Sequence, residues 1–115
     1  MHKKYILYGA GRNAETIIKR SRGIFEFDCV IDKDESKWGQ KIGGLEIKSP
    51  QFLKSQEYKN QDIIISITNE ALHESVVNDL YNLGFEYGVK CFDGVDIIPL
   101  GEAQPGHVSG VIKGI

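Results

Sequence analysis

The first part of the chain joins a strand-like run to a helix-like pattern through a glycine-containing turn. Residues 4–8 (KYILY) are mostly apolar, favour strand, and stop at a glycine. Apolar side chains then return at Ala14, Ile17 and Ile18, the spacing of one face of an α-helix. The sequence therefore predicts a strand over residues 4–8 and a helix over residues 11–22.

This alternation continues along most of the chain. Further strands are predicted at residues 25–31, 45–48, 62–67 and 89–92, a short helix at 51–55 after Ser49-Pro50, and a longer helix capped by Thr68-Asn69 and ended by Gly84. The expected inner stripe of the longer helix consists of Leu72, Val76, Val77, Leu80 and Leu83. Residues 33–44 are polar and contain three glycines, which predicts a loop.

Three consecutive isoleucines within residues 62–67 indicate a strand that is covered on both faces, as in a parallel sheet. Strands separated by helical segments imply right-handed crossovers, with helices on both faces of the sheet. The predicted fold is therefore α/β: a small Rossmann-like, three-layer domain with a mostly parallel sheet.

The chain length leaves room for one domain. It has 115 residues, of which 41% are hydrophobic and 26% charged, the balance of an ordinary globular protein. Residues 100–115 hold four glycines and one proline and show no helical stripe. We predict a nucleotide-binding domain over residues 1–98 and a glycine-rich tail over residues 99–115. That tail would pack on a partner or lead into a missing domain of a longer protein.

Composition also argues against several classes of partner. Fourteen basic residues stand against sixteen acidic ones, so no basic excess points to nucleic acid. No aliphatic run is longer than the three isoleucines at 63–65, which predicts no membrane span. The two cysteines, Cys29 and Cys91, form no CxxC or metal-type spacing, and they fit core positions in a protein of the reducing cytoplasm.

The segment from Gly9 to Ala14 (GAGRNA) carries the chemistry, because it fits GxGxxA between a predicted strand and helix. Gly9 allows the tight turn, and Gly11 lets a phosphate or ribose approach the backbone. Ala14 lets the helix pack closely on the sheet, and the helix N-terminus favours an anion. Alternatively, the motif makes only a tight turn beside an empty crevice.

Asp32 and its neighbours extend this candidate site. Asp32 follows the second strand 21 residues after Gly11, where a dinucleotide-binding domain places a carboxylate on a ribose, although it could equally cap its own loop. Arg12 would pair with a phosphate and Asn13 with a base, sugar or amide edge, unless both are simply solvated. Two further residues, Thr68 and Asn69, end the central strand, where ligands bind in open parallel sheets, and they also suit a helix cap.

No catalytic or metal-binding residue is predicted. The charged run at residues 32–35 reads as a solvated loop, and Trp38 would cover the crevice or pack under its loop. His2, His73 and His107 are scattered over a terminus, a helix and the tail, so no histidine pairing is expected.

Several segments together resemble a known group of domains. They are Tyr8-Gly9-Ala10-Gly11, Val30-Ile31-Asp32-Lys33-Asp34, Lys37-Trp38-Gly39, residues 42–47, Ser49-Pro50 and residues 63–66. In order and spacing they are similar to the Rossmann-like domain of bacterial enzymes of surface-polysaccharide and nucleotide-sugar biosynthesis. Examples are the N-terminal domains of sialic-acid- and bacillosamine-type sugar acetyltransferases and of nucleotide-sugar dehydratases, and accessory domains of sugar methyltransferases.

The resemblance covers about residues 4–98 and implies a UDP-sugar or NAD as ligand. It would place Gly9, Gly11, Arg12 and Asn13 along the diphosphate, and Asp32 at a ribose or beside the uracil. The acetyltransferases bind acetyl-CoA in a separate β-helix that this chain lacks, and their catalytic histidine has no assignable counterpart here.

Three functions follow, in order of preference. The first is a nucleotide- or nucleotide-sugar-binding module that is not catalytic alone and works with the remainder of a longer chain or within a homo-oligomer. The second is an NAD-dependent oxidoreductase or a fragment of one, which lacks room for a substrate domain. The third is an assembly domain with a vestigial Rossmann turn.

Overall fold

The computed structural model describes residues 4–24 and 26–94. In chain order the elements are β1 (Lys4–Tyr8), α1 (Arg12–Ser21), β2 (Glu26–Ile31), the 3-10 helix η1 (Glu35–Lys37), β3 (Lys41–Ile42), β4 (Leu45–Lys48), the 3-10 helix η2 (Pro50–Lys54), α2 (Gln56–Lys59), β5 (Asp62–Ile65), α3 (Glu70–Asn82) and β6 (Cys91–Asp93). The predicted α/β fold is thereby confirmed.

The strands form one sheet of six in the order β3-β4-β2-β1-β5-β6. All neighbours pair in parallel except β3 and β4, which form an antiparallel edge. The chain moves outward from β1 to β2 and β4 and then crosses back to β5 on the other side of β1. The carboxyl ends of β1 and β5 are therefore the point where the strand order reverses, which is where open α/β sheets bind ligands.

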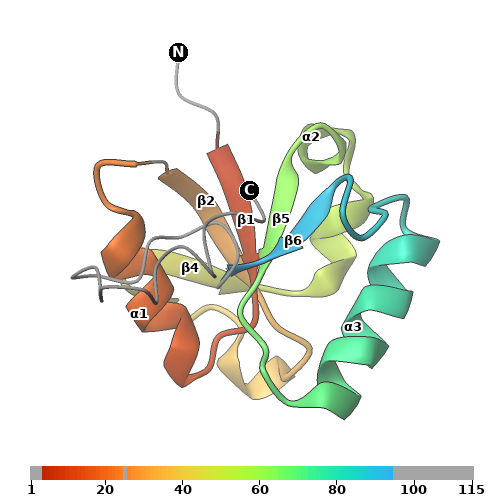
Figure 1. Cartoon of the computed structure of the whole chain (residues 1–115). Helices are drawn as coiled ribbons and strands as arrows, with labels where there is room; N and C mark the ends of the chain where they lie inside the picture. Colours follow the sequence, from red (N-terminus) through yellow and green to blue (C-terminus); the bar gives the residue numbers. More distant parts are fainter. Residues whose placement is uncertain (1–3, 25, 95–115) are drawn as a thin grey trace, which may run out of the picture.

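Each face of the sheet has its own apolar core, and Figure 1 shows α1 on one side of the sheet and α3 on the other. On the α1 face, Ala14, Ile17 and Ile18 of the helix pack on residues that include Leu7 and Ile64. The opposite face is covered by α3 and by the connection between β4 and β5. The triple-isoleucine strand is buried along its whole length, as its composition predicts.

The loop and helix predictions need three corrections. Residues 33–44 contain η1 and the two-residue strand β3, which is too short to show a period. The helix that Ser49 begins is a 3-10 helix, and the separate turn of α2 follows it. Leu72 is 57% exposed, so its assignment to the inner stripe is wrong.

The glycine-rich tail predicted at residues 99–115 lies outside the described residues, as do His2 and His107. Within the described part of the chain, no helix combines the length and the apolar character that crossing a membrane requires.

Candidate functional site

The turn between β1 and α1 is packed against the end of β5. Gly9 has a φ of +112°, and a Cβ at this position would lie 2.5 Å from the Ser66 hydroxyl oxygen and 3.0 Å from Cγ1 of Ile67. The same Ser66 hydroxyl lies within hydrogen-bond distance of the carbonyl oxygens of Tyr8, at 3.1 Å, and of Gly9, at 2.9 Å. The fold therefore requires glycine at position 9 whether or not a ligand binds.

No close contact and no unusual backbone angle requires glycine at position 11. Its φ of −91° suits any residue, and a Cβ built on it would meet no atom of the described residues within 4 Å. Gly11 is the N-cap residue of α1 and, having no side chain, makes no side-chain cap bond to the first turn. Ala14, by contrast, is fully buried against the sheet, which confirms its predicted packing role.

Asp32 joins the glycine turn to the loop after β2. Its Oδ2 accepts a hydrogen bond from the Ala10 amide at 2.7 Å, and its Oδ1 accepts one from the Asp34 amide at 2.8 Å. The indole of Trp38 donates to the Asp32 carbonyl at 2.7 Å. The loop-capping interpretation of Asp32 is thus realised. The carboxylate stays half-buried, with lone pairs that a ribose hydroxyl can use, so its ribose role stays a prediction.

The remaining predicted residues lie at the start of α1 and in the segment after β5. The Asn13 amide nitrogen is 3.4 Å from both the Ser66 carbonyl and the Thr68 hydroxyl, which brings α1 close to the segment after β5. Asn69 caps α3 by accepting from the Leu72 amide at 3.1 Å. The structure thus brings the whole predicted set to the carboxyl edge of the sheet, namely Gly9, Gly11, Arg12, Asn13, Asp32, Thr68 and Asn69.

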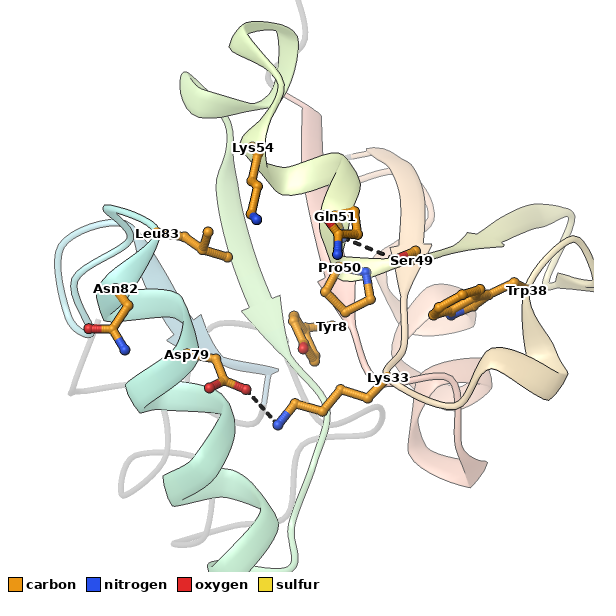
Figure 2. Close-up of a pocket in the computed structure, with 10 residues that line it drawn as sticks. All are labelled: Tyr8, Lys33, Trp38, Ser49, Pro50, Gln51, Lys54, Asp79, Asn82 and Leu83. Carbon is orange, nitrogen blue, oxygen red and sulfur yellow. Dashed lines mark hydrogen bonds and ion pairs between the residues drawn. The ribbon is translucent and has the colours of Figure 1, made fainter.

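A cavity of about 410 Å³ lies next to this edge, on the sheet face opposite α1. Figure 2 shows it between η2 and α3, with Tyr8 at its floor. Its lining is Tyr8, Lys33, Trp38, Ser49, Pro50, Gln51, Lys54, Asp79, Asn82 and Leu83. Four separate segments supply these residues, so no local sequence pattern could have revealed the cavity. None of the residues predicted to bind a ligand belongs to this lining.

Polar interactions inside the cavity are only partly satisfied. Lys33 crosses the cavity (Figure 2), where its Nζ binds the Asp79 carboxylate at 2.5 Å and the Ser75 hydroxyl at 3.0 Å. Tyr8 is 1% exposed, and its hydroxyl has no hydrogen-bond partner among the described residues. Burial, with the carboxylates of Asp79 and Asp32 nearby, raises the pKa of Tyr8, which therefore stays a neutral hydroxyl.

A second polar cluster joins α3 to β6. His73 Nε2 lies 2.5 Å from Oδ1 of Asp93, and the Tyr87 hydroxyl donates to Oδ2 at 2.5 Å. A search of the sequence for pairs of histidines could not find this cluster, because it combines one histidine with a carboxylate and a phenol. In the first turns of α3 the inward position belongs to His73, and not to Leu72 as the predicted apolar stripe required.

The cysteines behave as core residues. Both are buried, and burial raises the pKa of Cys29 and of Cys91 to about 11, so both remain protonated thiols at neutral pH. Within the described residues, no group of three or more His, Cys, Asp or Glu is placed to hold a metal ion.

Comparison with solved structures confirms the Rossmann-like fold. UDP-D-quinovosamine 4-dehydrogenase from Vibrio fischeri is 21% identical, with a TM-score of 0.61 over 72% of this chain and 73% of that one. RSP, a Rex-family repressor also solved with β-NAD+ and operator DNA, is 18% identical, with a TM-score of 0.59 over 93% of this chain. Perosamine N-acetyltransferase from Caulobacter crescentus, solved with CoA and GDP-perosamine, is 15% identical, with a TM-score of 0.58 over 74% of this chain.

This chain spans only 50% of the repressor and 40% of the acetyltransferase. A comparison with curated protein sequences finds no significant match. A family model described as C2185-like, N-terminal, matches residues 1–88, more than half of the chain. The chain therefore belongs to the family of C2185-like N-terminal domains.

Proposed function

We propose that this chain is the nucleotide- or nucleotide-sugar-binding module of a cytoplasmic, sugar-modifying enzyme of bacterial surface-polysaccharide biosynthesis, and that it is not catalytic alone. Gly11 carries the proposal. The backbone angle at this position suits any residue and no described atom lies within 4 Å of a Cβ built there, yet the residue is glycine at the start of a ten-residue helix. A ligand that comes close to the backbone would explain the glycine, because a side chain at this position would block its approach.

In this proposal, a part of the ligand is assigned to each element at the carboxyl edge of the sheet. The diphosphate would lie on the first turn of α1, where free amide groups and the positive end of the helix dipole favour an anion. The exposed side chain of Arg12 would pair with a phosphate, and Asn13 would close the crevice toward Thr68. Asp32 would accept a ribose hydroxyl while it keeps its two backbone bonds.

The structural neighbours support a nucleotide as the ligand class. The dehydrogenase acts on a UDP-sugar, the acetyltransferase was solved with GDP-perosamine, and the repressor with NAD. At 15–21% identity these likenesses show the fold alone, so the choice between a UDP-sugar and NAD belongs to experiment.

Isothermal titration of the full chain with UDP-N-acetylglucosamine and with NAD tests the proposal. We expect one of them to bind, and Gly11→Ala to weaken that binding at least about tenfold because its methyl group occupies the approach to the backbone. Thr16→Ala, an exposed position on the same helix, is the matched control and should bind as the wild type does. If neither nucleotide bound, the result would instead favour the third function, an assembly domain with a vestigial Rossmann turn.

A further inference from the structure

The cavity between η2 and α3 is crossed by an ion pair that keeps unused hydrogen-bonding capacity. Lys33 Nζ binds Oδ2 of Asp79 at 2.5 Å and donates to the Ser75 hydroxyl oxygen at 3.0 Å. An ammonium has three N–H donors and a carboxylate has two acceptor oxygens. One N–H of Lys33 and Oδ1 of Asp79 therefore have no partner among the described residues. The two side chains are 45% and 47% exposed, so a ligand can reach both groups.

Other polar side chains of the lining can also donate and accept. The side-chain amides of Gln51 and Asn82 each combine an N–H donor group with a carbonyl oxygen, and neither amide makes a hydrogen bond within the described part of the chain. In Figure 2 Gln51 comes from η2 and Asn82 from α3, on the two sides of the cavity. The lining therefore suits a ligand whose own groups donate and accept at once, as hydroxyl groups do.

Aromatic and apolar surface completes the lining. Trp38 is 39% exposed, and its indole N–H donates to the Asp32 carbonyl oxygen at 2.7 Å, which holds the ring at the cavity. Pro50 and the Tyr8 ring add apolar surface, while the buried Tyr8 hydroxyl is given no part in binding. A pyranose ring has C–H groups on its faces and hydroxyls around its edge, so it matches this combination of aromatic surface, donors and acceptors.

We propose that the cavity between η2 and α3 binds a pyranose sugar that carries neighbouring hydroxyl groups. One hydroxyl accepts from the free N–H of Lys33, and the next donates to Oδ1 of Asp79. Gln51 and Asn82 bind further hydroxyls, and Trp38 covers a C–H face of the ring. The cavity volume of about 410 Å³ lies within the range of about 300–1,000 Å³ that is usual for small-molecule sites.

Such a ring can come from a free monosaccharide or from a nucleotide sugar. Tyr8 directly precedes Gly9, and Lys33 directly follows Asp32, so the cavity adjoins the proposed nucleotide site. For the sugar of a nucleotide sugar, the inference rests on the proposed nucleotide-binding function. For a free sugar, it stands apart from that function.

Trp38 is the sole tryptophan in the chain, so its indole N–H gives one NMR signal at the cavity. We would titrate the isotope-labelled full chain with glucose, galactose and N-acetylglucosamine, and measure the binding of UDP-N-acetylglucosamine and of UDP by calorimetry. We expect one of two results. Either a free sugar shifts the Trp38 signal with a dissociation constant of about 1–10 mM, or UDP-N-acetylglucosamine binds at least about tenfold more tightly than UDP.

Asp79→Asn isolates the proposed acceptor. The ion pair is half-exposed, so its loss should cost little stability and the fold should be retained. The amide lacks the charge that strengthens a hydrogen bond from a hydroxyl. We therefore expect the affinity for the free sugar, or the preference over UDP, to fall about tenfold while UDP binding stays unchanged. Glu74→Gln, which removes an exposed carboxylate of the same helix outside the lining, is the matched control.

The inference is overturned if no free sugar shifts the Trp38 signal and UDP-N-acetylglucosamine binds no more tightly than UDP. A sugar response that Asp79→Asn leaves unchanged also overturns it. Binding of UDP or NAD in either case would leave the proposed nucleotide-binding function standing. A free-sugar response that is lost in Asp79→Asn, without binding of any nucleotide, would support the sugar site while the proposed nucleotide-binding function fell.

Discussion

An added methyl group should destabilise the fold strongly at Gly9 and hardly at all at Gly11. At Gly9 an alanine must adopt a φ of +112° and press its Cβ to 2.5 Å from the Ser66 hydroxyl oxygen. The backbone conformation costs about 1–3 kcal/mol and the overpacking about 1–3 kcal/mol. Gly9→Ala should therefore lower the free energy of unfolding by about 2–6 kcal/mol.

At Gly11 the same change meets open space at a φ of −91°. Alanine is a poorer N-cap residue than glycine by about 0.5 kcal/mol, but it also removes freedom from the unfolded chain, worth about 0.4–1 kcal/mol. These contributions oppose each other, so Gly11→Ala should leave the free energy of unfolding within about 0.5 kcal/mol of the wild type.

Urea unfolding followed by far-ultraviolet circular dichroism measures both variants on one scale. With a slope of about 1–3 kcal/mol per molar urea, Gly9→Ala should move the midpoint down by about 1 M or more, whereas Gly11→Ala should hardly move it. If Gly11→Ala were as unstable as Gly9→Ala, glycine would be needed at position 11 by the fold itself. The argument from Gly11 to a ligand would then fail.

Three further predictions concern the surrounding structure. Asp32→Ala should lower the free energy of unfolding by about 1–3 kcal/mol in urea titrations, because the partly buried Ala10 amide loses its acceptor; an unchanged midpoint would contradict this. Asp93→Ala removes the partner of His73, so it should lower the free energy of unfolding by about 1–2 kcal/mol and weaken the hydrogen-exchange protection of β6. Full protection of β6 in this variant would show that the contact between His73 and Asp93 does not hold β6 to α3. The pKa of Cys29 and of Cys91 is raised from 9.0 to about 11, so folding keeps their protons; stability should be fully present below pH 9 and fall as the pH rises through 11. In a Cys29→Ala, Cys91→Ala double variant that fall should be smaller by about 2 kcal/mol or more, and an equal fall in both proteins would refute it.

The elements that repeat a pattern over several residues could be predicted from sequence. The strand, glycine turn and helix at the start follow local rules, and so does α3, where Asn69 caps the first turn and Gly84 adopts a φ of +98° after the last. The residues of the predicted crevice converge for a topological reason, since the carboxyl ends of parallel strands meet at one edge.

Other features depend on contacts between distant segments. The two residues of β3 become a strand only because Lys41 and Ile42 pair with Glu46 and Leu45 across a glycine turn. Leu72 continues the spacing of Val76 and Leu80, but the inward place in that turn belongs to His73, whose ring meets Asp93 on the edge strand. A polar residue with a half-buried partner thus takes the place of the apolar residue that the helical period favours.

The cavity follows from how little chain covers one face of the sheet. The connection from β4 to β5 consists of a five-residue 3-10 helix and a four-residue helical turn, where a longer crossover helix would lie flat along α3. The short connection leaves the Tyr8 side chain at the floor of the cavity, while the next residue, Gly9, turns the chain into α1 on the opposite face.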